Sequence, residues 1–233
     1  KRQVSGCGAG ISGNGDINLV DGVLIGGMNW TSGTTLTLSA YRNINLGYAT
    51  LIDATVGNGN IVLRADNTGT GTGSVKFDAN ALGVQGNNGY TKIYYNPDDY
   101  FHPTDFSLFV TMIGSGQFNA YMAINLTAGI VSKTYDGTTT ATLSGAINPM
   151  VTPPWVTINT SGAIATFNDR FAGTNKAVTI SGVTLSGPDS GKYFLNGLDA
   201  KTATINKANL TLNGGLTAND KTYNGTTTAT ISG

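Results

Sequence analysis

Short segments that alternate apolar and polar residues recur through the first third of the chain. Each would place two apolar side chains on one face of a β-strand. Phrases rich in Gly and Asn separate them, as expected of tight turns. The segments are "INL" at 17–19, "VLI" at 23–25, "LTL" at 36–38, "INL" at 44–46, "IVL" at 61–63 and "VKF" at 75–77.

Corresponding phrases lie roughly 19 to 25 residues apart, the scale of one rung in a parallel β-helix. Such a rung cannot bury its own apolar face and must stack on a neighbour. An antiparallel sandwich would also show short strands and Gly-rich turns. It explains the near-repeat of "LTLSA" (36–40) and "IVLRA" (61–65) less well, so we expect rungs.

Residues 87–128 are richer in aromatic side chains and contain Pro97 and Pro103. A stack of rungs ends in an open sheet edge, which invites aggregation unless something covers it. We therefore interpret this segment as an irregular last rung with a cap. Its aromatic residues are Tyr90, Tyr94, Tyr95, Tyr100, Phe101, Phe106, Phe109, Phe118 and Tyr121.

A threonine-rich phrase occurs twice, as "KTYDGTTTATLSG" at 133–145 and "KTYNGTTTATISG" at 221–233, with 11 of 13 positions identical and starts 88 residues apart. Strand-like segments and Gly, Pro and Asp turns fill the space between the copies. We predict a β-helix with an aromatic cap at 1–129, a small β domain at 130–210, and the start of a second copy at 211–233.

Composition supports an all-β protein, since the 13 acidic residues are all Asp and the good helix formers are scarce. The net charge of zero offers no basic stripe for nucleic acid. No apolar run approaches the roughly 20 residues of a membrane span. The lone Cys7 provides neither a disulfide framework nor a metal cluster. Because Lys1 opens the sequence without Met, we expect a piece of a longer chain.

Three phrases in the first part resemble the rod region of filamentous-haemagglutinin-like exoproteins of bacterial two-partner secretion. They are "TLTLSAYRNINLGYATL" (35–51), "GNGNIVLRADNTGTGTGSVKF" (57–77) and "IYYNPDDYFHPTDF" (93–106). This resemblance implies a right-handed β-helix, export through an outer-membrane transporter partner, and a role in attachment or aggregation. It implies no catalytic residues. The family's secretion domain is not evident here.

The stretch 131–212 resembles the YDG-type repeat of bacterial surface proteins, through "YDGTTTATLSG", "GKY" and the closing "KTATINKANLTL" strand. Tandem copies of such a repeat imply spacers. Asp189 to Tyr193 has the spacing of a tyrosine corner, in which the Tyr hydroxyl bonds nearby backbone. That spacing favours an immunoglobulin-like β-sandwich over a β-grasp, although an ordinary turn would show it too.

Catalytic chemistry has few candidates. With one His and no Glu, an acid–base pair is hard to assemble. Cys7 and His102 would have to meet from distant rungs, and we interpret His102 as a surface histidine. Asp98 and Asp99 could bind calcium, which needs 6 to 8 oxygens; a turn explains them better. We predict no catalysis, no metal and no cofactor. A β-helical polysaccharide lyase would need a recurring Asp cluster, which the rungs lack.

The best candidate binding surface combines aromatic rings, on which sugars stack, with carboxylates that accept sugar hydroxyls. It comprises Tyr94, Tyr95, Asp98, Asp99, Tyr100, Phe101 and His102. The alternative is that these rings fill the core of the cap. We expect a fragment of a secreted bacterial surface adhesin that binds polysaccharide or host glycan. Two rivals are a purely structural stalk and the rod of a contact-dependent toxin carrier.

Overall fold

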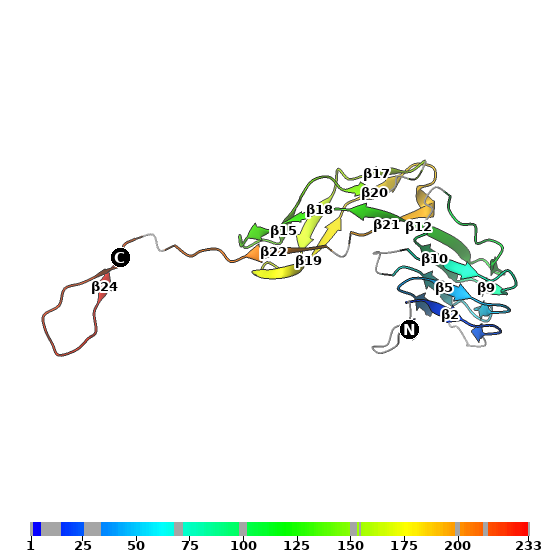
Figure 1. Ribbon diagram of the computed structural model, residues 1–233, viewed down its shortest axis with the longest axis horizontal. Coiled ribbons are helices and arrows are strands. Elements are labelled where there is room, and N and C mark those ends of the chain that lie inside the picture. Colours follow the sequence, from blue (N-terminus) through cyan, green and yellow to red (C-terminus); the bar gives the residue numbers. More distant parts are fainter. Residues whose placement is uncertain are drawn as a thin grey trace.

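The computed structural model describes residues 2–5, 15–25, 34–67, 72–97, 102–149, 153, 155–198, 201–211 and 214–232. Within these ranges the chain is almost entirely β-structure, with one 3₁₀ turn, η1 (Ser190–Lys192). The N-terminal part is a coil of stacked rungs, and a smaller β domain extends from one end of it (Figure 1). A hairpin near the C-terminus lies beyond that domain. The predicted all-β class and the β-helix are confirmed.

Three parallel sheets form the coil, and each of the first three rungs gives one strand to each sheet. Sheet A contains β1 (Arg2–Ser5), β4 (Thr35–Ser39), β7 (Asn60–Arg64), β10 (Tyr90–Tyr95) and β12 (Gln117–Thr127). Sheet B contains β2 (Ile17–Leu19), β5 (Ile44–Leu46) and β8 (Val75–Phe77). Sheet C contains β3 (Leu24–Ile25), β6 (Leu51–Asp53), β9 (Gly83–Gly86) and β11 (Val110–Met112).

The register of sheet A gives the true length of the rungs. Arg2 pairs with Leu36, Leu36 with Ile61, and Ile61 with Thr91, so each pair marks one full rung of the coil. Only the rung from Leu36 to Ile61 falls within the predicted spacing, and the others are longer. The predicted rung length was too short because the spacing was counted between phrases that belong to different sheets. The predicted match between "LTLSA" and "IVLRA" is confirmed as neighbouring strands.

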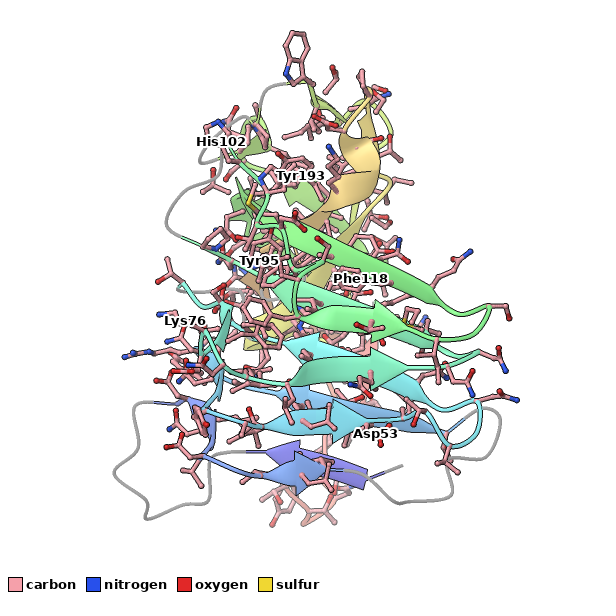
Figure 2. The ribbon with its side chains drawn as sticks, turned by 90° about the vertical axis from the view of Figure 1, so that its right-hand side faces the viewer. Asp53, Lys76, Tyr95, His102, Phe118 and Tyr193 are labelled. Carbon is pink, nitrogen blue, oxygen red and sulfur yellow. The ribbon has the colours of Figure 1, made fainter. Side chains whose placement is uncertain are left out.

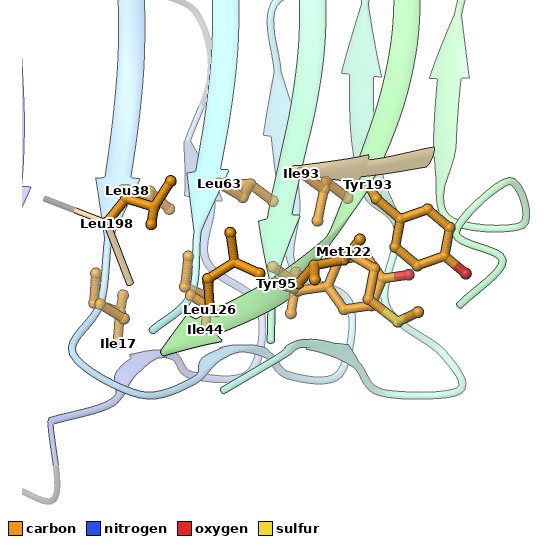
Figure 3. Packing of buried hydrophobic residues seen from close by; sticks show 14 of the residues in the cluster. Ile17, Leu38, Ile44, Leu63, Ile93, Tyr95, Met122, Leu126, Tyr193 and Leu198 are labelled. Atoms are coloured by element: carbon orange, nitrogen blue, oxygen red, sulfur yellow. The ribbon is translucent and has the colours of Figure 1, made fainter. Parts of the chain in front are cut away.

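The interior of the coil is a stack of aliphatic side chains, one layer for each rung. Leu38 pairs with Leu63 and Leu63 with Ile93, and all three are buried. Figure 3 shows this row continuing towards Met122 and Tyr193. Burial alternates along β4, β7 and β10, as one inward face and one outward face require. Stacking between rungs is therefore what buries the apolar face of each rung.

The cap differs from its prediction. Strands β10, β11 and β12 continue the regular parallel ladder, and among the described residues between β10 and β11 no strand continues sheet B. Phe109 stacks on Phe77 of β8 at 4.7 Å between ring centroids. The outer edge of β12 is covered instead by two strands from the second domain: β21 (Tyr193–Asn196), which is parallel to it, and β16 (Asn148–Pro149), which is antiparallel.

The second domain contains a six-stranded sheet of β13 (Ile130–Val131), β15 (Thr140–Leu143), β18 (Ile164–Phe167), β19 (Gly173–Ser181), β22 (Lys201–Asn206) and β14 (Lys133–Thr134). A two-stranded ribbon joins β17 (Thr157–Asn159) to β20 (Thr184–Ser186). The C-terminal hairpin pairs β23 (Thr217–Ala218) with β24 (Ile231–Ser232). This arrangement does not establish the two packed sheets of an immunoglobulin-like sandwich, so that detail stays a prediction.

Tyr193 is not the tyrosine corner that the sequence indicated. It begins β21, and its Cα is paired with that of Met122 in the coil. Its ring is buried with the coil's core, and among the described residues its hydroxyl forms no hydrogen bond to nearby backbone. Tyr193 thus joins the two parts of the molecule, so the predicted boundary at 129–130 does not separate two independent sheets.

Candidate functional site

Tyr95, one of the predicted binding residues, lies inside the coil. Only 1% of it is exposed (Figure 2). Its ring meets that of Phe106 edge-on, with 5.1 Å between the ring centroids. Its hydroxyl oxygen accepts a hydrogen bond of 2.7 Å from the backbone N–H of Thr104. Burial raises the pKa of this hydroxyl. The prediction of Tyr95 as a sugar-stacking ring is therefore wrong, and the alternative of a ring that fills the core holds for this residue.

Tyr94 points to the opposite face of β10 and belongs to an aromatic cluster on the outside of sheet A. Its ring stacks on Tyr121 at 5.1 Å and meets Phe194 of β21 edge-on at 5.3 Å. The guanidinium of Arg64 lies 5.7 Å from the centre of Tyr94 and 5.5 Å from that of Phe194. All four side chains are half-buried. We call these four residues the outer aromatic cluster.

The other predicted site residues are placed as follows. The residues Asp98 and Asp99 of the calcium candidate lie outside the described residues, as do Tyr100, Phe101 and the Cys7 of the Cys–His pair. His102 is exposed. The structure therefore brings Tyr94 together with residues that the sequence analysis did not assign to the site, Arg64 and Phe194 above all. Strand alternation could have shown that Arg64 and Tyr94 point outward; nothing local indicated Phe194.

A column of side-chain amides runs along the coil and into the second domain. The amide nitrogen of Asn96 donates to Asp66 at 2.5 Å, and that of Asn125 donates to Asn96 at 2.9 Å. Asn196 of β21 donates in turn to Asn125 at 3.0 Å. Asp66, Asn96 and Asn196 are buried, so satisfying these groups matters for stability. The column fixes the register between the coil and the second domain.

The repeated phrase has a structural explanation in a lysine-centred loop. The ammonium of Lys133 donates to the Asp136 carboxylate at 2.8 Å and to the Thr138 carbonyl at 3.0 Å. The second copy forms the same loop, with Lys221 donating to Asn224 at 3.1 Å and to the Thr226 carbonyl at 2.7 Å. We call these the two lysine clasps. The shared spacing of Lys, Asp or Asn, Gly and Thr in the phrase builds them.

Acidic groups in the second domain have lowered pKa values because of such bonds. Hydrogen bonds from Lys133 and Thr138 lower the pKa of Asp136 to about 2. The Lys176 ammonium and the Phe171 N–H lower the pKa of Asp169. These carboxylates stabilise the loops in which they lie. In the described ranges no group of three or more His, Cys or Asp side chains is positioned to hold a metal ion.

Residues 121–204 match the family model described as YDG domain. The match begins within β12 of the coil and ends within β22, so it includes both partners of the β12–β21 pair. It confirms the YDG-type resemblance of the second part, with a start that lies before the predicted boundary. Neither a curated protein nor a solved structure matches the chain. Within the described residues, no helix is long and apolar enough to cross a membrane.

Proposed function

We propose that this chain is a segment of a large secreted bacterial surface adhesin, exported with the help of an outer-membrane transporter partner. The single observation that carries the proposal is the pairing of β12 with β21, which makes the YDG domain continue sheet A of the coil. A β-helix joined in this way to a YDG domain forms one extended body, suited to hold a binding surface away from a cell. The proposed role is binding and involves no catalysis.

The proposed ligand is a polysaccharide or host glycan, bound on the outer face of sheet A. The outer aromatic cluster supports this, because sugars stack on aromatic faces and Tyr94 and Tyr121 remain partly exposed there. The guanidinium of Arg64 adds hydrogen-bond donors beside the rings. Three successive strands of sheet A and β21 of the YDG domain supply this surface, so it exists only when both parts are folded.

Binding of the intact chain to an array of bacterial and host polysaccharides tests the ligand. We expect Tyr94→Ala to weaken the strongest interaction at least tenfold, with the circular dichroism spectrum unchanged. Tyr48→Ala is the matched control, since Tyr48 is 57% exposed and lies outside the cluster. If the chain binds no polysaccharide on the array, the proposal of a glycan ligand is refuted. Antibody labelling of intact cells that make the full-length protein tests surface location, and labelling only after lysis would refute it.

A structural stalk is the second candidate, and the same β12–β21 pairing favours it. A stalk requires rigid coupling between its segments, but it needs no ligand within this segment. Deleting 15–206 from the full-length protein distinguishes the two. A stalk function predicts that a rod of the same length, built from other rungs, restores attachment. An adhesive function predicts that only this sequence restores it.

A further inference from the structure

A groove runs along one corner of the coil, where the chain passes from sheet C into sheet A. Its floor is bare backbone from Gly89 and Gly116. A Cβ on Gly89 would lie 2.1 Å from the Gly59 carbonyl oxygen, and one on Gly116 would lie 2.1 Å from that of Gly89, so the stacking excludes side chains here. We call this cavity of about 510 Å³ the corner groove. Its first wall is formed by Asn58, Asn88 and Ser115.

The second wall is formed by Asn60, Tyr90 and Gln117, which point outward from successive sheet A strands. The walls therefore repeat with the rungs, which are about 4.8 Å apart. That repeat is close to the length of one sugar unit in an extended chain. Along each wall, three rungs present one polar side chain each in a line, as a polymer with a regular repeat requires.

Part of the hydrogen-bonding capacity of these walls is used internally. Asn88 donates to Asn58 at 2.9 Å and accepts from the Ser115 N–H at 3.0 Å. Among the described residues, however, the Asn58 amide nitrogen and the whole Gln117 side chain form no hydrogen bond, and both side chains are exposed. An amide offers two donors and an acceptor, which suits the hydroxyl groups of a sugar.

The charge of the corner groove indicates the class of ligand. None of the residues that line it carries a charge at neutral pH. The ammonium of Lys92 lies 4.6 Å from the centre of the Tyr90 ring and covers one face of it. Four of the six polar side chains that line the groove are amides, so amides dominate recognition. This arrangement favours a neutral chain over one of uronic acids.

We propose that the corner groove binds a linear, neutral glycan that lies parallel to the axis of the coil. The proposal rests on the proposed function only in taking the ligand to be a glycan. The groove is separate from the outer aromatic cluster: Tyr90 and Tyr94 are four residues apart in β10, about 13 Å at the rise of an extended strand. A long polysaccharide could contact both, whereas a short oligosaccharide reports on the groove alone.

Calorimetric titration of the intact chain with neutral hexasaccharides of β-linked glucose and of β-linked N-acetylglucosamine tests this. Gln117→Ala removes hydrogen-bonding groups that no other described residue uses, so we expect affinity to fall about threefold to tenfold. Asn58→Ala removes a free amide nitrogen together with the acceptor of Asn88, so the same fall is expected, with an unchanged circular dichroism spectrum as the check on the fold. Gln117→Trp fills the groove and should abolish binding. Asn45→Ala is the matched control, because Asn45 belongs to an exposed amide pair with Asn18 outside the groove.

Three results would overturn the proposal. If Tyr94→Ala removes hexasaccharide binding and the groove variants do not, the glycan binds at the outer aromatic cluster, and the proposed function stands without the corner groove. If only a uronic-acid hexasaccharide binds, and does so less tightly in high salt, the neutral class is wrong. If no hexasaccharide and no polysaccharide binds, the corner groove and the proposed ligand fail together.

Discussion

Asn125 and Asn196 are 71 residues apart in the chain, yet the side-chain amide of Asn196 donates a hydrogen bond of 3.0 Å to Oδ1 of Asn125. Asn125 lies in the last strand of the coil, and Asn196 lies at the end of β21 in the YDG domain. Backbone pairing of the same two residues places the amides one above the other. The amide column thus passes through the junction as if β21 were a further rung.

Asn125→Ala should weaken this junction. It removes the acceptor for the buried Asn196 amide and the donor to Asn96, and an unsatisfied buried polar group costs about 1–3 kcal/mol. We expect a loss of that size in the free energy of unfolding, together with faster hydrogen exchange in β21. Denaturant unfolding and hydrogen exchange measure the two effects.

The exposed pair of Asn18 and Asn45 provides the comparison for that variant. Since water replaces the lost bond there, Asn45→Ala should change stability by no more than about 0.5 kcal/mol. Equal losses for Asn125→Ala and Asn45→Ala would contradict a special role for the junction, as would unchanged exchange in β21.

Thr91→Val should stabilise the coil. Thr91 is fully buried, and its hydroxyl has no hydrogen-bond partner among the described residues. Replacing this hydroxyl with a methyl group keeps the shape and removes an unsatisfied polar group, so we expect a gain of about 1 kcal/mol. Thr50→Val is the matched opposite, because the equally buried Thr50 donates to the Gly47 carbonyl at 2.6 Å. Denaturant unfolding should show a higher free energy of unfolding for Thr91→Val and a lower one for Thr50→Val. A lower free energy of unfolding in both variants would refute the argument.

Local patterns predicted the rungs well, because each rung must alternate to bury one face. The pairing of "LTLSA" with "IVLRA" followed from that alternation. The same rule, applied to β10, places Ile93 and Tyr95 inward and Tyr94 outward, and it would have divided the predicted aromatic site correctly. The prediction grouped the rings by composition, which carries no information about the face of a strand.

The junction could not have been predicted in this way. The β12–β21 pair joins segments that are far apart in the chain, and neither segment differs in sequence from an ordinary strand. The amides of the column are typical turn residues, so Asn96, Asn125 and Asn196 gave no separate signal. The corner groove depends on the stacking of Gly59, Gly89 and Gly116, which occupy equivalent positions only once the rungs are known.

Alkaline pH should destabilise the coil through Tyr95. Burial raises the pKa of this hydroxyl above its usual value, whereas the unfolded chain ionises near 10. The contribution of the protonated Tyr95 hydroxyl to folding stability is therefore fully present below pH 10. It is lost as the pH rises through the pKa that this hydroxyl has in the folded protein. Tyr95→Phe should flatten the fall in stability above pH 10 and cost about 1 kcal/mol at pH 7, because the Thr104 N–H loses its acceptor. Unfolding curves at several pH values measure both, and an unchanged alkaline slope would contradict the assignment.

The two lysine clasps should differ in their response to acid, because Asp136 in the first is replaced by Asn224 in the second. The pKa of Asp136 is lowered to about 2, against an ordinary value of 3.8. The ionised Asp136 carboxylate thus contributes its full stabilisation to the first clasp above pH 3.8, and this stabilisation is lost as the pH falls towards 2. Asn224 makes the same bonds to Lys221 and Thr226 without a titratable group. The second clasp should therefore keep its geometry over this range.

Exchanging the two residues tests this within one chain. We expect Asp136→Asn to preserve the first clasp at pH 7 and to remove its response to acid. Asn224→Asp should give the second clasp a carboxylate with a lowered pKa. Amide chemical shifts of Thr138 and Thr226, followed from pH 6 to pH 2, report on each loop separately. If Asp136→Asn opens the first clasp at pH 7, the Lys133 charge pair holds that loop and the shared hydrogen-bond geometry does not.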